Sequence, residues 1–558
     1  MLHSNKVLAQ QVVKAAIENG VKHVVISPGS RNAPLIIEWN AYPEIQKYSI
    51  VDERSAAFFA LGKAMYLGES VALVCTSGSA LLNYYPAIAE AFYSDIPLLI
   101  LSADRPKHLI DIGDGQTIRQ ENVFQNHIGN SANLIEDQPE ESVEIIKVAF
   151  ENFKKKNSPV HINIPFSEPL YDTTEALLIQ EKITNSPTPL SLLDETPWEV
   201  SDLQKFASIW NRATQKMLIV GVSRPDEMLQ IQLSHLAQDP SVIILTESTS
   251  NVSDERFINH IDRLIFPWSD ADFEPLKPEI LLTIGGQVVS KKIKSLLRKN
   301  KPQHHWHIDK NWGLDTYHSL TQHFNISPQL FFSQFFFLTQ PKASSYQSTL
   351  LEMNGQRTTK HDVFLKQAEF SDLKVYESIQ KHLPEGRNVV FSNSASIRYA
   401  QFFDWSKAPF MACNRGTSGI DGSTSTAIGF AHSAVQPTLF VSGELSFFYD
   451  SNALWNAYIP KNFRIIVVNN GGGGIFRFIP GPTTTNTLDF FETPHQLTAV
   501  HLCAMHQLEY LSAHDEKELN QQWNSFYEAG SQPKLLEIFT PRERNAEVLK
   551  GYFNAMKD

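Results

Sequence analysis

Residues 442–476 read SGELSFFYDSNALWNAYIPKNFRIIVVNNGGGGIF and say more about the architecture of this chain than any other stretch. An apolar run, TLFVS, ends in Gly443 and Glu444, and a second, RIIVV, ends in Asn469, Asn470 and four glycines. With a helical pattern between them, the two runs predict parallel strands joined by a right-handed crossover and ending at the same sheet edge. There a carboxylate, an amide oxygen and a free main-chain carbonyl can share one hard divalent cation. Glycine allows close backbone approach and a helix amino terminus favours phosphate, so the stretch predicts a cation that holds a diphosphate.

Taken singly, these features have ordinary explanations. Glycine-rich turns join strands and helices in many α/β proteins, and Asn-Asn at a strand end is most often turn chemistry. Their combination at fixed spacing is what favours a binding site. It resembles the thiamine diphosphate (ThDP) motif, which begins Gly-Asp and ends Asn-Asn after the crossover, with Glu444 at the position of the usual Asp.

The composition is that of an ordinary folded protein. Of the 558 residues 42% are hydrophobic and 19% are charged, and the length predicts about three or four domains. The formal net charge of −12 argues against a general nucleic-acid-binding protein, which normally carries a basic face. The three cysteines lie far apart without CxxC spacing, which argues against a disulfide framework or a structural zinc site. The amino terminus lacks a signal-peptide pattern and the apolar runs are too short to cross a bilayer, so we expect a cytoplasmic protein that binds neither nucleic acid nor membrane.

Helix and strand patterns alternate along the chain in three blocks, which predicts parallel sheets covered by helices. The expected fold class is therefore α/β, with three consecutive doubly wound parallel-sheet domains. Two stretches are expected to be connectors: residues 186–198 are rich in proline and polar side chains, and residues 339–361 show little periodicity. Pro86 should kink or restart the helix that contains it. The expected domains are residues 1–185, 199–340 and 360–558, the last of which contains the quoted motif.

If ThDP binds, its chemistry requires a second carboxyl group. The thiazolium carbon must lose a proton to the cofactor's own pyrimidine amino group, which becomes basic only when a carboxyl group hydrogen-bonds the opposite ring nitrogen. Glu53, in VDERSAAFFALGKA, fits this role. An isolated Glu there would be explained by the preference of acids for helix amino termini, but the segment resembles the glutamate motif of ThDP enzymes. The resemblance implies pyrimidine-binding, central and diphosphate-binding domains in that order, with active sites between the subunits of a homodimer or homotetramer.

Five further motifs narrow the family. They are SPGSRN (27–32), SADRP (102–106), DGQTIRQ (114–120), NSASIR (393–398) and NRGTSGIDG (414–422). Together they closely resemble the 2-succinyl-5-enolpyruvyl-6-hydroxy-3-cyclohexene-1-carboxylate (SEPHCHC) synthases of menaquinone biosynthesis, over essentially the whole chain. The resemblance implies decarboxylation of 2-oxoglutarate and 1,4-addition of the succinyl-semialdehyde carbanion to isochorismate, dependent on ThDP and on Mg²⁺ or Mn²⁺.

The basic residues independently favour a polyanionic substrate. A single arginine is most simply a solvated surface residue, and Lys291 with Lys292 could be a plain helix start. Arginine, however, binds carboxylates through paired hydrogen bonds, and each expected substrate carries two carboxylates. An acidic protein therefore needs a local basic pocket. Four arginines lie in loops after expected strands, where open α/β sheets bind ligands: Arg31, Arg105, Arg398 and Arg415.

The resemblance also implies roles for individual residues. The expected metal ligands are Glu444, Asn470 and the carbonyl of Gly472. The expected catalytic residues are Glu53, Ser30, Arg31 and Gln116, and the expected substrate-binding residues are Arg105, Lys291, Ser394, Arg398 and Arg415. The expected cofactor-binding residues are Glu53, Ser394, Gly419, Ile420, Gly443, Leu445, Ser446, Asn470, Gly473, Ile475 and Phe476. Ile420 is expected to hold ThDP in its bent conformation, unless it merely packs in the core, and Ile475, Phe476 and Ile479 are expected to form an apolar wall. The role of Lys292, where the family often has Arg, is left open.

Three alternative functions fit parts of the sequence. Another ThDP-dependent 2-oxoacid carboligase or decarboxylase would share the cofactor motifs, but an enzyme for small monocarboxylates would not need this set of arginines. A ThDP-fold protein without catalytic activity would suit Glu444 but not the presence of Glu53 and the loop arginines. A nicotinamide-dependent Rossmann enzyme would need GxGxxG after its first strand, which SPGSRN does not supply.

Overall fold

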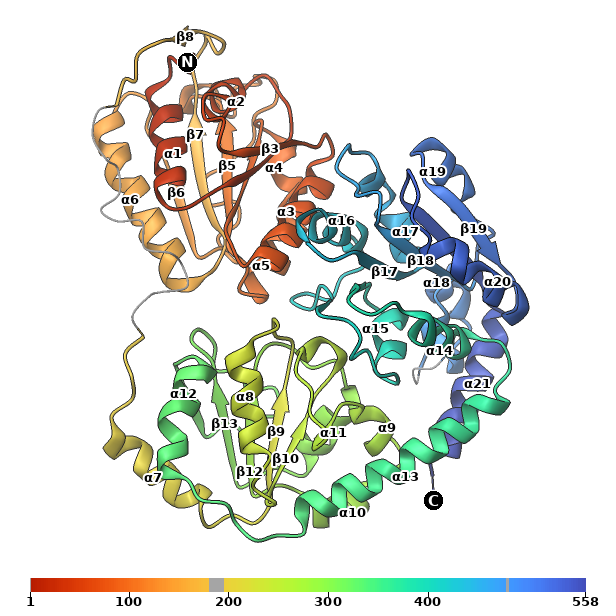
Figure 1. Cartoon of the computed structure of the whole chain (residues 1–558). Coiled ribbons are helices and arrows are strands. Elements are labelled where there is room, and N and C mark those ends of the chain that lie inside the picture. The colour runs from red at the N-terminus through yellow and green to blue at the C-terminus, as the bar shows by residue number, and fades with distance from the viewer. Residues whose placement is uncertain (1, 180–194, 478–480, 558) are drawn as a thin grey trace.

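The computed structural model of the chain describes residues 2–179, 195–477 and 481–557. It contains three six-stranded sheets, in each of which all neighbouring strands are parallel. Helices pack around each sheet, and the three units follow one another along the chain (Figure 1). The expected fold class, α/β with three consecutive doubly wound parallel-sheet domains, is confirmed. Most of the expected linker at 186–198 lies outside the described residues.

The strands have the following bounds. The first sheet, in spatial order, consists of β3 (Gln46–Ser49), β2 (His23–Ile26), β4 (Val71–Cys75), β5 (Leu98–Asp104), β7 (Val160–Pro165) and β6 (Asn130–Asn133). The middle sheet consists of β11 (Phe257–Ile258), β10 (Val242–Leu245), β9 (Lys216–Val220), β12 (Ile280–Ile284), β13 (His304–Ile308) and β14 (Gln322–Phe324). The third sheet consists of β16 (Met411–Ala412), β15 (Asn388–Phe391), β17 (Thr438–Gly443), β18 (Arg464–Asn469), β20 (Lys534–Phe539) and β19 (Glu509–Ala513). A separate antiparallel pair joins β1 (His3–Ser4) to β8 (Thr173–Thr174).

The central strands are buried on both faces, as expected for parallel sheets covered by helices. β4 reads VALVC and β5 reads LLILSAD, and every residue of both is buried. Such strands lack the alternation of a half-exposed strand, and their continuous apolar runs were the signal that located them in the sequence.

The first and third sheets share one strand order, and in each the direction of winding reverses next to the first strand of the sheet. After β2 the chain adds β3 on one side and then β4 on the other; after β15 it adds β16 on one side and β17 on the other. At such a reversal the loops leave in opposite directions and open a crevice at the carboxyl ends of the strands, where doubly wound sheets bind ligands. NSASIR follows β15, and β17 ends in Gly443 with Glu444 directly after it, so the topology brings two of the sequence motifs to one crevice.

The helices of the first unit are α1 (Val7–Glu18), α2 (Ala33–Asn40), α3 (Glu53–Leu67), α4 (Ser79–Asn83), α5 (Tyr85–Tyr93) and α6 (Pro139–Lys156). The middle unit contains α7 (Val200–Trp210), α8 (Glu227–Leu236), α9 (Ile261–Ile265), α10 (Asp270–Phe273), α11 (Lys291–Lys299) and α12 (Pro328–Phe335). The third unit contains α14 (Asp372–His382), α15 (Ala395–Ala400), α16 (Ser423–Ser433), α17 (Glu444–Tyr449), α18 (Leu488–Glu492), α19 (Val500–Met505), α20 (Glu516–Tyr527) and α21 (Arg542–Ala555). Pro86 stands in the first turn of α5, so the predicted restart of this helix is confirmed.

The stretch at 339–361 is not the irregular connector that its weak periodicity suggested. Most of it belongs to α13 (Tyr346–Gln367), a 22-residue helix that spans from the middle unit to the third (Figure 1). The buried residues of α13 recur at helical spacing, but they include the polar Arg357 and His361 as well as Leu350 and Leu365. Because polar residues occupy part of the buried face, the apolar pattern alone did not reveal the helix.

The first and third units pack directly on each other through α3 and α16. A Cβ at Gly62 would lie 2.0 Å from the carbonyl oxygen of Thr426, and one at Gly429 would lie 2.0 Å from that of Phe59. The two helices therefore approach so closely that only glycine fits at these two positions. This contact fixes how the first sheet faces the third.

Candidate active site

A cavity of about 510 Å³ opens at the carboxyl edge of the third sheet. It lies at the reversal between β15 and β17, and Lys291, at the start of α11 in the middle unit, also lines it. Among the residues expected at the site, those that line it are Lys291, Ser394, Arg398, Arg415, Ile420, Gly443, Glu444, Leu445, Ser446, Asn470, Gly472, Gly473, Ile475 and Phe476. Gly419 lies just behind, where its carbonyl accepts a hydrogen bond from Asn393 Nδ2 at 2.7 Å. Ile479 lies outside the described residues.

The three expected metal ligands meet at the ends of β17 and β18. Glu444 is buried and its Oε1 accepts a hydrogen bond from the Gly472 N–H at 2.8 Å. Asn470 Oδ1 is buried and accepts no hydrogen bond from any described residue. A buried amide oxygen without a donor is costly unless a ligand satisfies it. A carboxylate and an orphaned amide oxygen at one sheet edge therefore fit a hard divalent cation, which oxygen ligands suit.

Sequence reasoning did not find the residue that orients Asn470. Asp372, at the start of α14, is buried, and its Oδ2 accepts a hydrogen bond from Asn470 Nδ2 at 3.2 Å. Its Oδ1 accepts from Thr540 Oγ1 at 2.6 Å and from Asn545 Nδ2 at 2.9 Å. Asp372 thereby holds the Asn470 amide so that its NH₂ faces inward and Oδ1 faces the cavity. Its only sequence signal was a carboxylate at a helix amino terminus, which is common.

His495 is a second residue that the sequence did not reveal. Its Nε2 lies 3.5 Å from Glu444 Oε1, and it follows α18 in a loop that also closes over Gly471. A single histidine in a loop carries no recognisable spacing, so only the fold shows that it neighbours the carboxylate.

Arg398 and Arg415 form a pair of like charges beside the expected metal ligands. Burial, and then the charge of Arg415, lowers the pKa of Arg398 below its ordinary value. Arg415 Nη1 donates to Asn393 Oδ1 at 2.9 Å, whereas the guanidinium group of Arg398 donates to no acceptor among the described residues. Two half-buried guanidinium groups with unused donors form a site for an anion, above all a carboxylate.

The two lysines at the start of α11 point in different directions. Lys291 is exposed and lines the cavity, whereas Lys292 Nζ donates to the Trp268 carbonyl at 2.7 Å inside the middle unit. The backbone just before Lys291 is held by Glu247, whose oxygens accept from the N–H groups of Val289 and Ser290 at 2.6 and 2.8 Å. Burial raises the pKa of Glu247 to about 7, while these two hydrogen bonds oppose the rise.

The five expected residues of the first unit do not line this cavity. They gather instead at the carboxyl edge of the first sheet, where Ser30 and Gln116 are exposed. Arg31 and Arg105 are neighbours, since burial and then the charge of Arg105 lower the pKa of Arg31. Burial is also the main reason that the pKa of Glu53 is raised, and the neighbouring Asp52 adds to it. The chain therefore carries two separate clusters, one on each of the related sheets.

Comparison with known proteins places this geometry in a family. Residues 6–134 match the family described as "Thiamine pyrophosphate enzyme, N-terminal TPP binding domain", and residues 194–391 match "Middle domain of thiamine pyrophosphate". The SEPHCHC synthase of Flavobacterium johnsoniae is 48% identical over 558 residues, covering 100% of both chains. The chain belongs to the SEPHCHC synthase family. Two further members are the synthase of Flavobacterium psychrophilum, 49% identical over 99% of each chain, and that of Porphyromonas gingivalis, 38% identical over 96% of this chain and 94% of the relative.

Membership of the SEPHCHC synthase family makes the chain a transferase of the ThDP type. Within the described ranges no helix combines the length and the apolar character needed to cross a bilayer. The resemblance stated from the motifs is thus confirmed at the level of the family.

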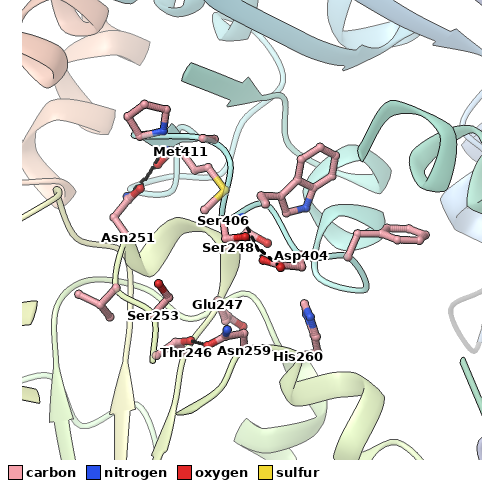
Figure 2. A pocket seen from close by; sticks show the side chains of 15 residues that line it. Thr246, Glu247, Ser248, Asn251, Ser253, Asn259, His260, Asp404, Ser406 and Met411 are labelled. Atoms are coloured by element: carbon pink, nitrogen blue, oxygen red, sulfur yellow. Dashed lines mark hydrogen bonds between the residues drawn. The ribbon is translucent and has the colours of Figure 1, made fainter. Parts of the chain in front are cut away.

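A second, smaller cavity of about 200 Å³ lies where the middle and third units of the chain meet (Figure 2). Thr246 and Glu247 lie below Asp404 and Ser406 in the figure, and Ser248 lies beside the latter two. Asn251 Nδ2 donates across the junction to the Met411 carbonyl at 2.9 Å. Among the described residues that line this second cavity, none is expected at the active site. The second cavity is therefore distinct from the cavity beside Glu444.

Proposed function

We propose that this chain catalyses ThDP- and divalent-metal-dependent decarboxylation of 2-oxoglutarate and 1,4-addition of the remaining four-carbon unit to isochorismate, giving SEPHCHC in menaquinone biosynthesis. The observation that carries the proposal is the cavity itself. It combines oxygen ligands for a cation, glycines at a strand end and an anion-binding pair of arginines in one crevice. Relatives named for this activity match the chain over its full length, and a cytoplasmic location suits such a reaction.

The residues of the third unit are suited to hold the cofactor's diphosphate. Glu444, Asn470 and the Gly472 carbonyl would hold Mg²⁺ or Mn²⁺, and Gly473, Leu445 and Ser446 lie where the backbone can approach the phosphates. A Cβ at Gly472, whose φ is +156°, would lie 2.7 Å from the Glu492 carbonyl oxygen, so this position requires glycine. Ile420, which lines the cavity, would offer apolar support to the bound cofactor.

Bound ThDP supplies a thiazolium ring that accepts the electron pair released when carbon dioxide leaves a 2-oxo acid. Glu53 would act on the cofactor's pyrimidine ring. Because burial raises its pKa, this carboxyl group retains a proton more readily than an exposed Glu, and it can share that proton with a ring nitrogen. Its function is to hold a proton at this position, not to bind substrate.

The separation of the two clusters leads us to propose an active site between two chains. Glu53, Arg31 and Arg105 lie on the first sheet and the cation ligands on the third, and they do not meet within one chain. A second copy, placed by a two-fold axis, would bring each first-sheet cluster to the partner's cavity. A homodimer is then the smallest active form, and a homotetramer of two such dimers is compatible with it.

Charge and polarity divide the cavity between the two substrates. Arg398, Arg415 and Ser394 are placed to bind the carboxylates of 2-oxoglutarate. Ile475 and Phe476 would exclude water from the reacting carbon, so that the acceptor molecule and not a proton meets it. The residues proposed to bind isochorismate are Ser30, Arg31, Arg105, Gln116 and Lys291.

A direct assay tests this proposal. Purified protein with ThDP and either Mg²⁺ or Mn²⁺ should consume isochorismate, followed by its absorbance, only when 2-oxoglutarate is also present. Omission of ThDP should abolish the loss. Preferential turnover of pyruvate, or no reaction with either metal despite ThDP binding, would contradict the proposal and favour another carboligase or an inactive relative.

A further inference from the structure

The loop of residues 414–420 presents side chains to the active-site cavity. Arg415, Ser418 and Ile420 all line it, and the loop connects β16 to α16 without regular structure. Ser418 has a φ of +61°, a conformation that a non-glycine residue adopts only when its surroundings hold it there. The geometry of this loop therefore depends on what binds it from outside.

The principal anchor comes from another unit of the same chain. Glu90, on α5 of the first unit, is fully buried. Its Oε1 accepts a hydrogen bond from the Gly416 N–H at 2.6 Å, and its Oε2 accepts from the N–H and the Oγ1 of Thr417 at 2.6 and 2.8 Å. Hydrogen bonds from successive N–H groups to one carboxylate fix both the position and the orientation of the backbone.

The loop is also shaped to lie against this helix. A Cβ at Gly416 would lie 2.5 Å from the Glu90 carbonyl oxygen and 2.7 Å from Ser94 Oγ, so only glycine permits the approach. On its other side the Gly416 carbonyl accepts from Gln287 Nε2 of the middle unit at 2.6 Å. Asn393 of the third unit donates to the carbonyls of Asn414 and Gly419 at 2.6 and 2.7 Å.

We propose that Glu90 is a positioning residue of the active site, which fixes the 414–420 loop across the boundary between the first and third units so that Arg415 and Ile420 face the cavity. Glu90 touches no substrate or cofactor in this arrangement; it acts through the loop. Its carboxylate provides acceptors for both N–H groups and the hydroxyl, which neither a shorter nor an uncharged side chain can do in the same way.

This inference rests on the proposed active site between two chains and adds a consequence to it. Each first unit then serves two sites: Glu53, Arg31 and Arg105 complete the partner's cavity, whereas Glu90 shapes the cavity of its own chain. A defect at Glu53 and a defect at Glu90 in the same chain therefore damage different active sites of the dimer.

Kinetics of Glu90→Gln provide the first test. Glutamine keeps the size but has one acceptor oxygen, so one main-chain N–H loses its partner and the loop shifts. We expect KM for 2-oxoglutarate to rise about tenfold or more, with a smaller change in kcat. Glu38→Gln is the matched control, because Glu38 is also fully buried in the first unit and accepts from the Ser4 N–H at 3.0 Å and His3 Nδ1 at 2.9 Å, away from the cavity. This control should leave KM unchanged. Thr417→Val removes a single bond to Glu90 and should raise KM less, which keeps the test usable if Glu90→Gln does not fold.

Mixed dimers provide the decisive test. A chain carrying Glu53→Gln and a chain carrying Glu90→Gln, given different affinity tags and purified as a mixed dimer, contain one active site with both defects and one with neither. At a limiting concentration of 2-oxoglutarate the mixed dimer should recover about half of the wild-type activity, since one of its two sites is intact. Each homodimer of a variant should remain well below that.

The outcomes separate this inference from the proposed function. If Glu53→Gln alone keeps its turnover, or no dimer carrying both tags forms, the proposed two-chain site is wrong. If the mixed dimer forms and Glu53→Gln is inactive, but activity is not recovered, Glu90 acts on the partner's site and our assignment is overturned. Equal KM values for Glu90→Gln, Thr417→Val and wild type would also overturn it.

Discussion

The hydrogen bond between Asp372 and Asn470 offers a way to weaken the proposed metal site without removing any of its proposed ligands. In Asp372→Asn the new amide has the size of the carboxylate but only one acceptor oxygen. The Oδ1 position receives two donors, Thr540 Oγ1 and Asn545 Nδ2, whereas the Oδ2 position receives only Asn470 Nδ2. The new NH₂ group should therefore take the Oδ2 position, where it would face the NH₂ of Asn470.

Two facing donors cannot remain in place, so we expect the Asn470 amide to turn over. Its oxygen would then accept from residue 372 and its NH₂ would face the cation. Loss of a group that orients a metal ligand typically lowers metal affinity by about 10- to 100-fold, which corresponds to about 1.4–2.7 kcal/mol. The free energy of unfolding without metal should change far less, since the substitution keeps the shape and removes a buried charge.

The measurement is the initial rate against the concentration of free Mg²⁺ or Mn²⁺ at saturating ThDP, paired with calorimetric titration of the metal. The matched control is Thr540→Val, which removes the bond to Asp372 Oδ1 at 2.6 Å but leaves the Asn470 contact intact. We expect a metal activation constant raised at least about tenfold in Asp372→Asn and close to wild type in the control. Equal constants in Asp372→Asn and wild type would refute the reasoning, and with it the orientation assigned to Asn470.

Three further predictions follow from the site and its surroundings. Glu53→Gln should bind ThDP with nearly unchanged affinity, measured by calorimetry. Its turnover should fall about 100-fold or more, since the amide cannot hold the proton in the same way. Near-normal turnover would contradict the role proposed for Glu53. Lys291→Ala should raise KM for isochorismate about tenfold by loss of a charged hydrogen bond. Lys292→Ala should leave KM unchanged, because Lys292 Nζ already donates to a main-chain carbonyl. Equal effects of the two substitutions would contradict the placement of the two lysines. Burial raises the pKa of Asp450 to about 7, so the folded protein binds this proton more tightly than the unfolded chain does. The free energy of unfolding should then fall between about pH 4 and pH 7, by up to about 1.4 kcal/mol per pH unit, and Asp450→Asn should lose that slope in urea unfolding.

The grouping of the residues proposed to hold the diphosphate could be predicted because it follows from local order along the chain. Glu444 and Asn470 end neighbouring parallel strands, and the carboxyl ends of such strands meet at one edge whatever else the chain does. The loops with Ser394 and Arg415 follow the adjoining strands β15 and β16 of the same sheet, so they reach the same crevice. The grouping of these loops depends only on the order of strands and helices along the chain.

The residues that the sequence missed act between distant segments. Asp372 meets Asn470 across 98 positions, and Glu90 meets Thr417 across 327. Neither carboxylate has a distinctive neighbourhood, since acids at helix starts and in amphipathic helices are common. The helix α13 was missed for a related reason, because the polar side chains of Arg357 and His361 occupy its buried stripe.

By itself the sequence determined the fold class, the order of the three α/β units and the identity of the side chains that end each strand. These depend on short-range periodicity and on the fixed handedness of parallel crossovers, which the chain carries locally. Only the tertiary structure decided which side chains orient others: Asp372 behind Asn470, Glu247 behind Lys291, and Glu90 behind the 414–420 loop. Those relations depend on how helices of different units pack, as at Gly62 and Gly429, where the absence of a side chain allows α3 and α16 to meet. The same packing leaves the five expected residues of the first unit outside the cavity of the third unit in the same chain.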